Sequence, residues 1–163
     1  MNKVLKKVVI FVLAVSLLMG TSSIAYAASS EYNIGDTIDG SILTRDSESE
    51  ITVINPMRGN ILNQGTAKIT NKGDGVVNVY GAVFGSVVCD KLMLDMTLQR
   101  LQNGIWVDVQ YFSDRAYNQA LLTNSYNVSV TKGYYYRVKA ACVAQKGSTS
   151  ESKMPITNGL WID

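Results

Sequence analysis

The sequence predicts an all-β fold, an antiparallel β-sandwich of about seven strands over residues 63–163. Three observations favour it. Apolar and polar residues alternate from Gly65 onward, turn residues interrupt them at intervals of roughly ten positions, and Asn103-Gly104 separates two of the alternating runs. Alternation is typical of strands with one buried face, and Asn-Gly is the preferred pair for a two-residue hairpin.

The Asn103-Gly104 hairpin fixes the register of the two strands that it joins. If Gln102 pairs with Ile105, the apolar residues of both strands share one face, which we expect to be buried. The opposed pairs are Leu101 with Trp106, Gln99 with Asp108, Leu98 with Val109 and Met96 with Tyr111. The predicted buried face comprises Leu94, Met96, Leu98, Val107, Val109 and Tyr111. Leu101 and Trp106 then lie on the exposed face.

A further long strand is predicted over residues 134–143. Its even-numbered residues are apolar or aromatic, whereas its odd-numbered residues include Arg137 and Lys139, so we expect the odd face to be exposed. Residues 153–162 are expected to close the sheet as an edge strand, where Pro155 is tolerated.

The first 27 residues have the pattern of a secretory signal peptide. Lys3, Lys6 and Lys7 precede an apolar run over residues 8–19, and Ala25-Tyr26-Ala27 fits a cleavage site. The apolar run is too short to cross a bilayer, which needs about 20 residues as a helix. We therefore expect a secreted, extracellular protein with no stable membrane insertion after cleavage.

An acidic, largely irregular leader is predicted over residues 28–62. Its first thirty residues hold six acidic side chains against Arg45 alone. Two interpretations remain open: the leader folds back on a basic face of the β-domain, or it is a solvated flexible arm.

Composition excludes several classes of function. The sequence has no histidine, which removes the common Ser-His and Cys-His nucleophile systems and histidine-ligated metals. Without the signal the charge is close to neutral, which gives no electrostatic case for binding nucleic acid. We expect no catalytic residues, no metal and no cofactor.

Two segments resemble fibronectin type III domains. Residues Tyr134-Tyr135-Tyr136-Arg137-Val138-Lys139-Ala140, followed by a glycine-containing loop and Thr149-Ser150-Glu151-Ser152, resemble the last two strands of that family. Residues 94–109, with Trp106, resemble its third strand and the return from it. The resemblance implies a fibronectin type III or immunoglobulin-like sandwich. The sequence departs from the family where Val79 or Gly81 replaces the buried tryptophan of the second strand.

A closer resemblance covers most of residues 38–163. It is to a family of small secreted proteins of Gram-positive bacteria, a domain of unknown function. The resemblance implies a secreted β-domain and carries over no catalytic residue. The segments that carry it are Ile38-Asp39-Gly40-Ser41, Arg58-Gly59, Cys89-Asp90-Lys91, Leu98-Gln99-Arg100, Gly133 to Val138 and Gly159-Leu160-Trp161-Ile162.

The two cysteines, Cys89 and Cys142, are expected to form a disulfide, because exported chains meet an oxidising environment. A fibronectin-like strand order places Cys142 opposite Leu92 and Tyr136 opposite Leu98. Cys89 then lies roughly 10 Å beyond its ideal position, so the connecting loop must bend back. Two buried thiols or an intermolecular bond are the alternatives.

The same strand order puts Tyr135 opposite Gln99, one position from the pair formed by Leu101 and Trp106. The exposed sheet face would then carry a set of aromatic, apolar and basic residues suited to binding a glycan or a cell-surface protein. These candidate ligand-binding residues are Trp106, Tyr135, Leu101, Arg137 and Lys139. The alternative is that Trp106 covers Leu101 as a cross-strand pair, or that residues 51–62 of the leader cover both.

The function predicted from these features is a secreted binding or adhesion module with no enzymatic activity. A secreted bacteriocin-like or toxin-like effector is the second hypothesis. A structural coat or matrix protein that assembles through edge strands is the third. The sequence does not fix the oligomeric state or the ligand.

Overall fold

The structure, a computed structural model, describes residues 32–55 and 61–163, so the expected signal peptide lies outside it. The described chain is all-β and forms one nine-stranded sheet. The strands are β1 (Thr37–Ile38), β2 (Ser41–Thr44), β3 (Glu48–Ile54), β4 (Leu62–Gly73), β5 (Val76–Gln102), β6 (Ile105–Ser129), β7 (Tyr134–Lys146), β8 (Thr149–Lys153) and β9 (Gly159–Ile162). Nowhere in these two ranges is there a helix long and apolar enough to cross a membrane.

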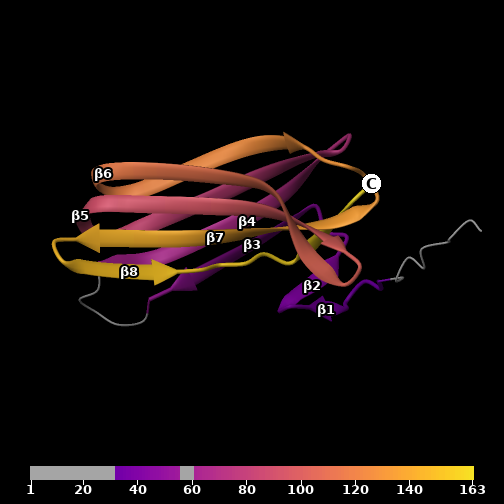
Figure 1. The fold of residues 1–163 in the computed structure, drawn as a ribbon, viewed down its shortest axis with the longest axis horizontal. Helices are drawn as coiled ribbons and strands as arrows, with labels where there is room; N and C mark the ends of the chain where they lie inside the picture. Colours follow the sequence, from indigo (N-terminus) through magenta and orange to yellow (C-terminus); the bar gives the residue numbers. More distant parts are fainter. Residues whose placement is uncertain (1–31, 56–60) are drawn as a thin grey trace, which may run out of the picture.

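The sheet curls over so that its two ends face each other (Figure 1). Its strands follow the order β1-β2-β9-β7-β5-β4-β3, with β6 paired to β5 and β8 paired to β7. Neighbouring strands are antiparallel except for β2 and β9, which run parallel. The last strand of this order, β3, contacts the segment before β9, since the amide of Asn158 donates to the Ser49 hydroxyl on β3 at 3.0 Å.

The long strands β5 and β6 form a ribbon that belongs to both halves of the curled sheet. The first part of β5 pairs with β4 and its second part pairs with β7, while β6 follows β5 through both parts. The ribbon turns back on itself between Phe84 and Cys89, where its pairing is interrupted. Gly81 and Met96 consequently meet across the interior. A Cβ atom on Gly81 would lie 2.6 Å from the Met96 sulfur, so a larger residue there would require the Met96 side chain to shift.

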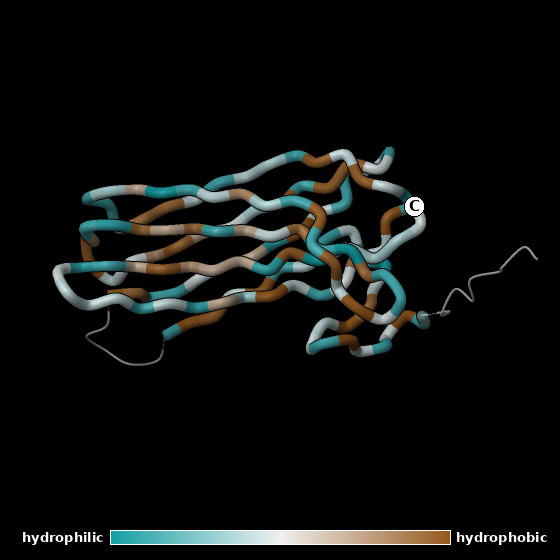
Figure 2. The backbone as a smooth tube through the Cα atoms, in the orientation of Figure 1, coloured by the Kyte–Doolittle hydropathy of each residue, from teal (hydrophilic) through white to brown (hydrophobic). Residues whose placement is uncertain are grey.

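Apolar side chains from β4, β5 and β7 fill the interior of the curled sheet. Hydrophobic and hydrophilic residues alternate along these strands (Figure 2), because successive side chains point to opposite faces. The largest fully buried residues of this core are Leu62, Ile69, Val77, Val79, Leu92, Leu94, Met96, Leu98, Tyr136, Leu160 and Ile162. Their burial is the main force that holds the two halves together.

The two parts of β6 close the open side of this interior. The rings of Phe112 and Tyr126 stack with their centroids 4.4 Å apart. Beside them, one oxygen of Asp114 accepts hydrogen bonds from the Tyr126 hydroxyl at 2.7 Å and from the Asn124 amide at 2.6 Å. These contacts join residues that lie in different halves of the sheet.

The prediction that residues 28–62 form an irregular leader is wrong over most of their described length, because β1, β2 and β3 lie in this segment. β3 pairs with β4, and Lys68 on β4 forms ion pairs with Glu48 at 2.9 Å and Glu50 at 3.5 Å. The leader therefore folds back on the β-domain rather than extending as an arm. Its acidic residues were a poor guide, since an edge strand tolerates charge on its exposed face.

The predicted hairpin register is confirmed near the turn and wrong beyond it. Leu101 pairs with Trp106 and Gln99 with Asp108, but a β-bulge at Val109 then shifts the pairing. Leu98 consequently lies opposite Gln110 and Met96 opposite Phe112. The bulge moves Phe112 into the core and leaves Val109 and Tyr111, which were expected to be buried, exposed at 46% and 60%. Val107 lies before the bulge and pairs with Arg100 as predicted, yet it is 38% exposed rather than buried.

The predicted pairing of β5 with β7 has the correct direction but is two residues out. Arg100, rather than Leu98, lies opposite Tyr136, and Gln99 lies opposite Arg137. A shift of two residues keeps every side chain on its predicted face. The expected edge strand at 153–162 is also wrong, because β9 lies between β2 and β7.

The expected disulfide is absent, and both cysteines are free and buried. Cys142 pairs with Leu94 across the sheet, and Cys89 lies five residues earlier on β5, roughly 17 Å along a strand. That separation exceeds the Cα distance of about 7 Å that a disulfide allows. The Cys142 sulfur packs instead at Gly65, where an added Cβ would lie 2.8 Å from it.

Candidate binding site

The predicted ligand-binding residues share one face, as expected, but that face is covered. Leu101, Tyr135 and Arg137 are only 2%, 4% and 2% exposed. Leu101 and Tyr135 form a small second core with Leu43 of β2, and further side chains pack against it. We call this set the aromatic cluster: Leu43, Leu101, Tyr135, Tyr32, Ile38, Trp106 and Trp161.

The cover is the β1–β2 hairpin together with Tyr32, rather than residues 51–62 as one interpretation proposed. The indole nitrogen of Trp106 donates a hydrogen bond to the carbonyl oxygen of Ile38 at 3.0 Å. Leu43 is fully buried in the same cluster. A ligand can therefore not reach Leu101 or Tyr135 while this hairpin is in place.

Arg137 is a structural residue that ties the cover to the sheet. Its guanidinium donates to the Gln99 side chain at 2.8 Å, to the Ser41 hydroxyl and the Asp39 carbonyl at 3.0 Å, and to the Asp39 carboxylate at 2.7 Å. It also lies 4.4 Å from the ring centre of Trp106. Four of its five N–H donors are thus used within the protein, and the side chain is buried, so it is not placed to bind a ligand.

The Asp39 carboxylate responds to this guanidinium. The hydrogen bond and the positive charge of Arg137 lower the pKa of Asp39 below its usual value, with a smaller contribution from Lys139. Lys139 is half-buried on the same face, opposite Thr97. Of the five candidate residues, Trp106 and Lys139 alone retain partial exposure.

Trp161 connects the aromatic cluster to a polar pocket. One side of its indole meets Tyr135 in an edge-on contact, with ring centres 4.9 Å apart. The guanidinium of Arg45 lies 5.6 Å from the indole centre. The indole nitrogen donates to the Asp163 carboxylate at 2.5 Å, which fixes the ring's orientation. The tryptophan is half-buried and presents the remainder of its surface to the pocket.

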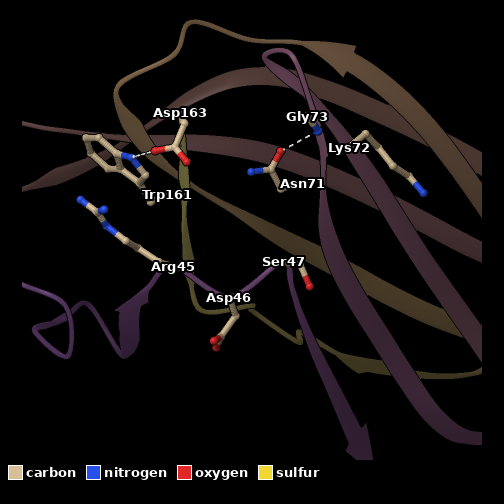
Figure 3. Close-up of a pocket in the computed structure, with 8 residues that line it drawn as sticks. All are labelled: Arg45, Asp46, Ser47, Asn71, Lys72, Gly73, Trp161 and Asp163. Carbon is tan, nitrogen blue, oxygen red and sulfur yellow. Dashed lines mark hydrogen bonds between the residues drawn. The ribbon is translucent and has the colours of Figure 1, made fainter.

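The pocket has a volume of about 380 Å³ and lies where three segments meet. These are the β2–β3 connection, the end of β4 and the last residues of the chain (Figure 3). Arg45, Trp161 and Asp163 form one wall, and Asn71 faces them from β4, whereas the side chains of Lys72 and Asp46 extend away from the space between (Figure 3). The complete lining is Arg45, Asp46, Ser47, Asn71, Lys72, Gly73, Trp161 and Asp163.

Backbone contacts hold these walls in place. The amide of Asn71 donates to the Ser47 carbonyl at 2.8 Å, which joins β4 to the β2–β3 connection. The amide of Gly73 donates to the Asn71 side chain at 2.9 Å, and Gly73 has a φ of 83°, a conformation that favours glycine. The pocket therefore combines an aromatic face, a guanidinium, an amide and a carboxylate at fixed positions.

The described residues hold no cluster of cysteine and acidic side chains that could bind a metal. Burial raises the pKa of the Cys142 thiol to about 12 and also raises that of Cys89. Neither thiol is therefore activated as a nucleophile.

A family model described as "Family of unknown function (DUF6147)" matches residues 21–159. The chain belongs to this family. The match confirms the expectation of an uncharacterised family. In this DUF6147 chain the matched residues include every described strand except the end of β9. No curated protein matches it significantly.

Among solved structures, the DUF6147 chain is similar to Spo0M, the sporulation control protein of Bacillus subtilis. The two are 9% identical, with a TM-score of 0.33, and the match covers 72% of this chain. The chain spans about half the length of that protein, 51%. So low a TM-score does not establish a shared fold.

Sequence reasoning missed the pocket of this DUF6147 chain. In the sequence, Trp161 stood out only within a segment of the family resemblance, and Arg45 only as the single cation of the leader's first thirty residues. No local pattern brings residues 45, 71 and 161 together, because the β2–β9 pairing that does so spans most of the chain. The one available signal was a tryptophan two positions before an acidic residue, Trp161 with Asp163.

Proposed function

We propose that this protein is a secreted, non-catalytic recognition module that binds one sugar ring of a glycan in the pocket beside Trp161. The observation that carries the proposal is the convergence of an indole, the Arg45 guanidinium and the Asp163 carboxylate on a cavity of about 380 Å³. A cavity of this size suits one ring, since pockets for small molecules begin at about 300 Å³.

The chemistry of the lining favours a neutral, hydroxyl-rich ring. An indole face gives the apolar side of a sugar a surface on which to stack. Arg45 supplies donors, Asp163 supplies acceptors and the Asn71 amide supplies both, which suits a ligand whose hydroxyl groups donate and accept. The two cations and two carboxylates in the lining balance, so the pocket has no net attraction for an anion.

The proposed binding site differs in position from the one that the sequence predicted, but the proposed kind of ligand, a glycan, is the same. Aromatic and basic residues do gather on the outer face of β7, yet the β1–β2 hairpin covers them. Trp161 is the member of the aromatic cluster that lines the pocket. Secretion remains part of the proposal and rests on the signal pattern of residues 1–27.

We also infer that the curled sheet is a variant of the fibronectin type III and immunoglobulin-like sandwich. If the two parts of β5 and of β6 are counted separately, β4 to β8 supply seven strands. In one group, the first part of β5 lies between β4 and the second part of β6, which are the second, first and fifth strands of the seven. In the other group, β7 lies between the second part of β5 and β8, which are the sixth, third and seventh. The immunoglobulin-type order has the same neighbours, which supports the inference.

Glycan binding is tested by titrating the protein with soluble cell-wall glycan fragments and mucin glycans while recording tryptophan emission. The Trp106→Phe variant leaves Trp161 as the only tryptophan and is the reference. In that background we expect Arg45→Gln to weaken binding about tenfold, since it removes both a donor and a stacking cation. Trp161→Ala, followed by calorimetry, should weaken it at least as much.

Lys91→Gln is the matched control. Lys91 lies 5.8 Å from the ring centre of Tyr117, so it is also a cation over an aromatic ring, but it is not part of the pocket. The control should bind as the reference does. Equal affinities for the Arg45 variant and the control, or no change of Trp161 emission with any glycan, would contradict the proposal.

A further inference from the structure

β6 is an edge strand along its whole length. It pairs with β5 from Ile105 to Ser129, and its other side has no strand partner among residues 32–55 and 61–163. At 25 residues it is much longer than the edge strands that proteins usually leave open. An open edge presents unpaired backbone donors and acceptors, which can pair with another strand.

Residues 121–129 are the regular part of this edge. Leu121 to Ser129 pair with Phe84 to Val76 without a bulge or shift. The Ser125 amide donates to the Asn124 side chain at 2.9 Å rather than to β5, so it points outward. The Asn78 amide on β5 reaches the Tyr126 carbonyl at 3.4 Å, so that carbonyl points inward. By alternation, the odd-numbered residues direct their backbone groups to the open side.

The usual protections of an edge strand are missing from this segment. Residues 116–129 contain no proline, no glycine and no charged side chain. The first part of β6 differs, because it has a bulge at Val109, an aspartate at 108 and the ion pair of Arg115 with Asp95 at 2.7 Å. Bulges and charges discourage strand addition, so addition is favoured at 121–129 and opposed at 105–115.

The segment is also close to self-complementary about Ser125. In an antiparallel pair of two copies centred there, Leu122 lies opposite Val128, Thr123 opposite Asn127, and Asn124 opposite Tyr126. In these three pairs apolar residues meet apolar ones and polar residues meet polar ones. At the two ends of the segment Leu121 lies opposite Ser129, and no like charges are opposed. A register centred on a residue also keeps the core face of one copy in line with the core face of the other.

We propose that two copies of this chain form a symmetric dimer by antiparallel pairing of residues 121–129 of β6. The outward groups of Leu121, Thr123, Ser125, Asn127 and Ser129 would exchange about ten backbone hydrogen bonds across the two-fold axis, with the Asn124 side chain releasing the Ser125 amide. β3, β4, β5 and β6 of both copies would then form one continuous sheet. This inference does not depend on the glycan site, because the pocket lies at the β2–β3 connection and the end of β4.

Sedimentation equilibrium of the purified full-length protein tests this proposal. We expect the wild-type protein to be a dimer at micromolar concentration. Ser125→Lys places two positive charges opposite each other at the axis and should shift the protein to monomer. Ser125→Asp should do the same, and an equimolar mixture of the two variants should restore the dimer, because opposite charges then face each other.

Ser150→Lys is the control, since Ser150 is an exposed residue of β8, whose one strand partner in the described ranges is β7. It should remain dimeric. Thermal unfolding of each variant checks that the monomer stays folded, which is expected because Ser125 is exposed. A monomeric wild-type protein would overturn the proposal. So would a mixture of the Lys and Asp variants that remains monomeric, or a control that dissociates to the same extent.

Discussion

The guanidinium of Arg137 holds together parts of the chain that are far apart in sequence. It contacts Asp39 and Ser41 of the leader, Gln99 of β5 and Trp106 of β6. The arginine side chain is 3% exposed, whereas that of Asp39 is 75% exposed, so the buried partner depends on a carboxylate that water also solvates. Its hydrogen bonds therefore matter more than the charge pair alone.

Replacing Arg137 by methionine should lower the free energy of unfolding by about 2–3 kcal/mol. Methionine retains apolar contact with Trp106 but leaves the Gln99 and Ser41 side chains without their partner. Urea unfolding at pH 7 measures the change. Arg137→Lys should be almost as damaging, because an ammonium cannot make the same set of bonds.

Acid should reduce the difference in free energy of unfolding between the wild-type protein and the Arg137→Met variant. The pKa of Asp39 is lower in the folded state than in the unfolded one, so the ion pair stabilises the protein above the unfolded pKa. That contribution is lost as the pH falls through the lowered folded pKa. Repeating the unfolding near pH 3 should therefore give a smaller difference, and Asp39→Asn should remove this pH dependence. An unchanged difference would show that the carboxylate contributes nothing.

Both cysteines should be free thiols that do not react in the folded protein. The thiolate is the reactive form, and burial raises the pKa of Cys142 to about 12 and also raises that of Cys89. With a thiol reagent at pH 8 we expect no labelling of the folded protein and two labelled thiols after denaturation without reductant. Labelling of neither cysteine in the denatured protein would instead show the disulfide that the sequence suggested.

At the level of the elements, the sequence correctly predicted the features that depend on local sequence pattern, such as the register next to a hairpin turn. The Asn103-Gly104 turn set the correct pairing of Leu101 with Trp106, because both turn residues adopt positive φ, 51° and 82°. The bulge at Val109 has no comparable signal. It arises from packing, because it lets the large ring of Phe112 reach Tyr126 while Tyr111 faces solvent.

The leader strands and the pocket escaped prediction for a related reason. β1 and β2 are only two and four residues long, and their stability comes from contacts with residues about a hundred positions away. The sequence did place Trp106 and Tyr135 on one face, and in the structure both belong to the aromatic cluster. Whether that face is open could not follow from alternation, because alternation says which way a side chain points and not what covers it.

At the scale of the whole molecule, the β1–β2 hairpin, the aromatic cluster and the pocket form one connected unit. Leu43 packs beside Tyr135, Tyr135 contacts Trp161, and Trp161 lines the pocket together with Arg45, the residue after β2. A Cβ atom on Gly159 of β9 would lie 2.7 Å from Leu43 and 2.8 Å from Trp106, so the unit is tightly packed. The hairpin should therefore support the site without touching the ligand.

Loosening the hairpin should accordingly weaken glycan binding. Leu43→Ala removes a fully buried side chain and should lower the free energy of unfolding by about 2–4 kcal/mol. In the Trp161→Phe background, where Trp106 is the only tryptophan, we expect its emission to shift to longer wavelength as water enters the cluster. Glycan affinity, measured in the protein that retains Trp161, should also fall, because Leu43 supports Tyr135 and Tyr135 contacts Trp161. Val128→Ala is the control, because it opens the main core on β6 without reaching the cluster. A similar loss of affinity in both variants would mean that the hairpin has no particular part in supporting the pocket.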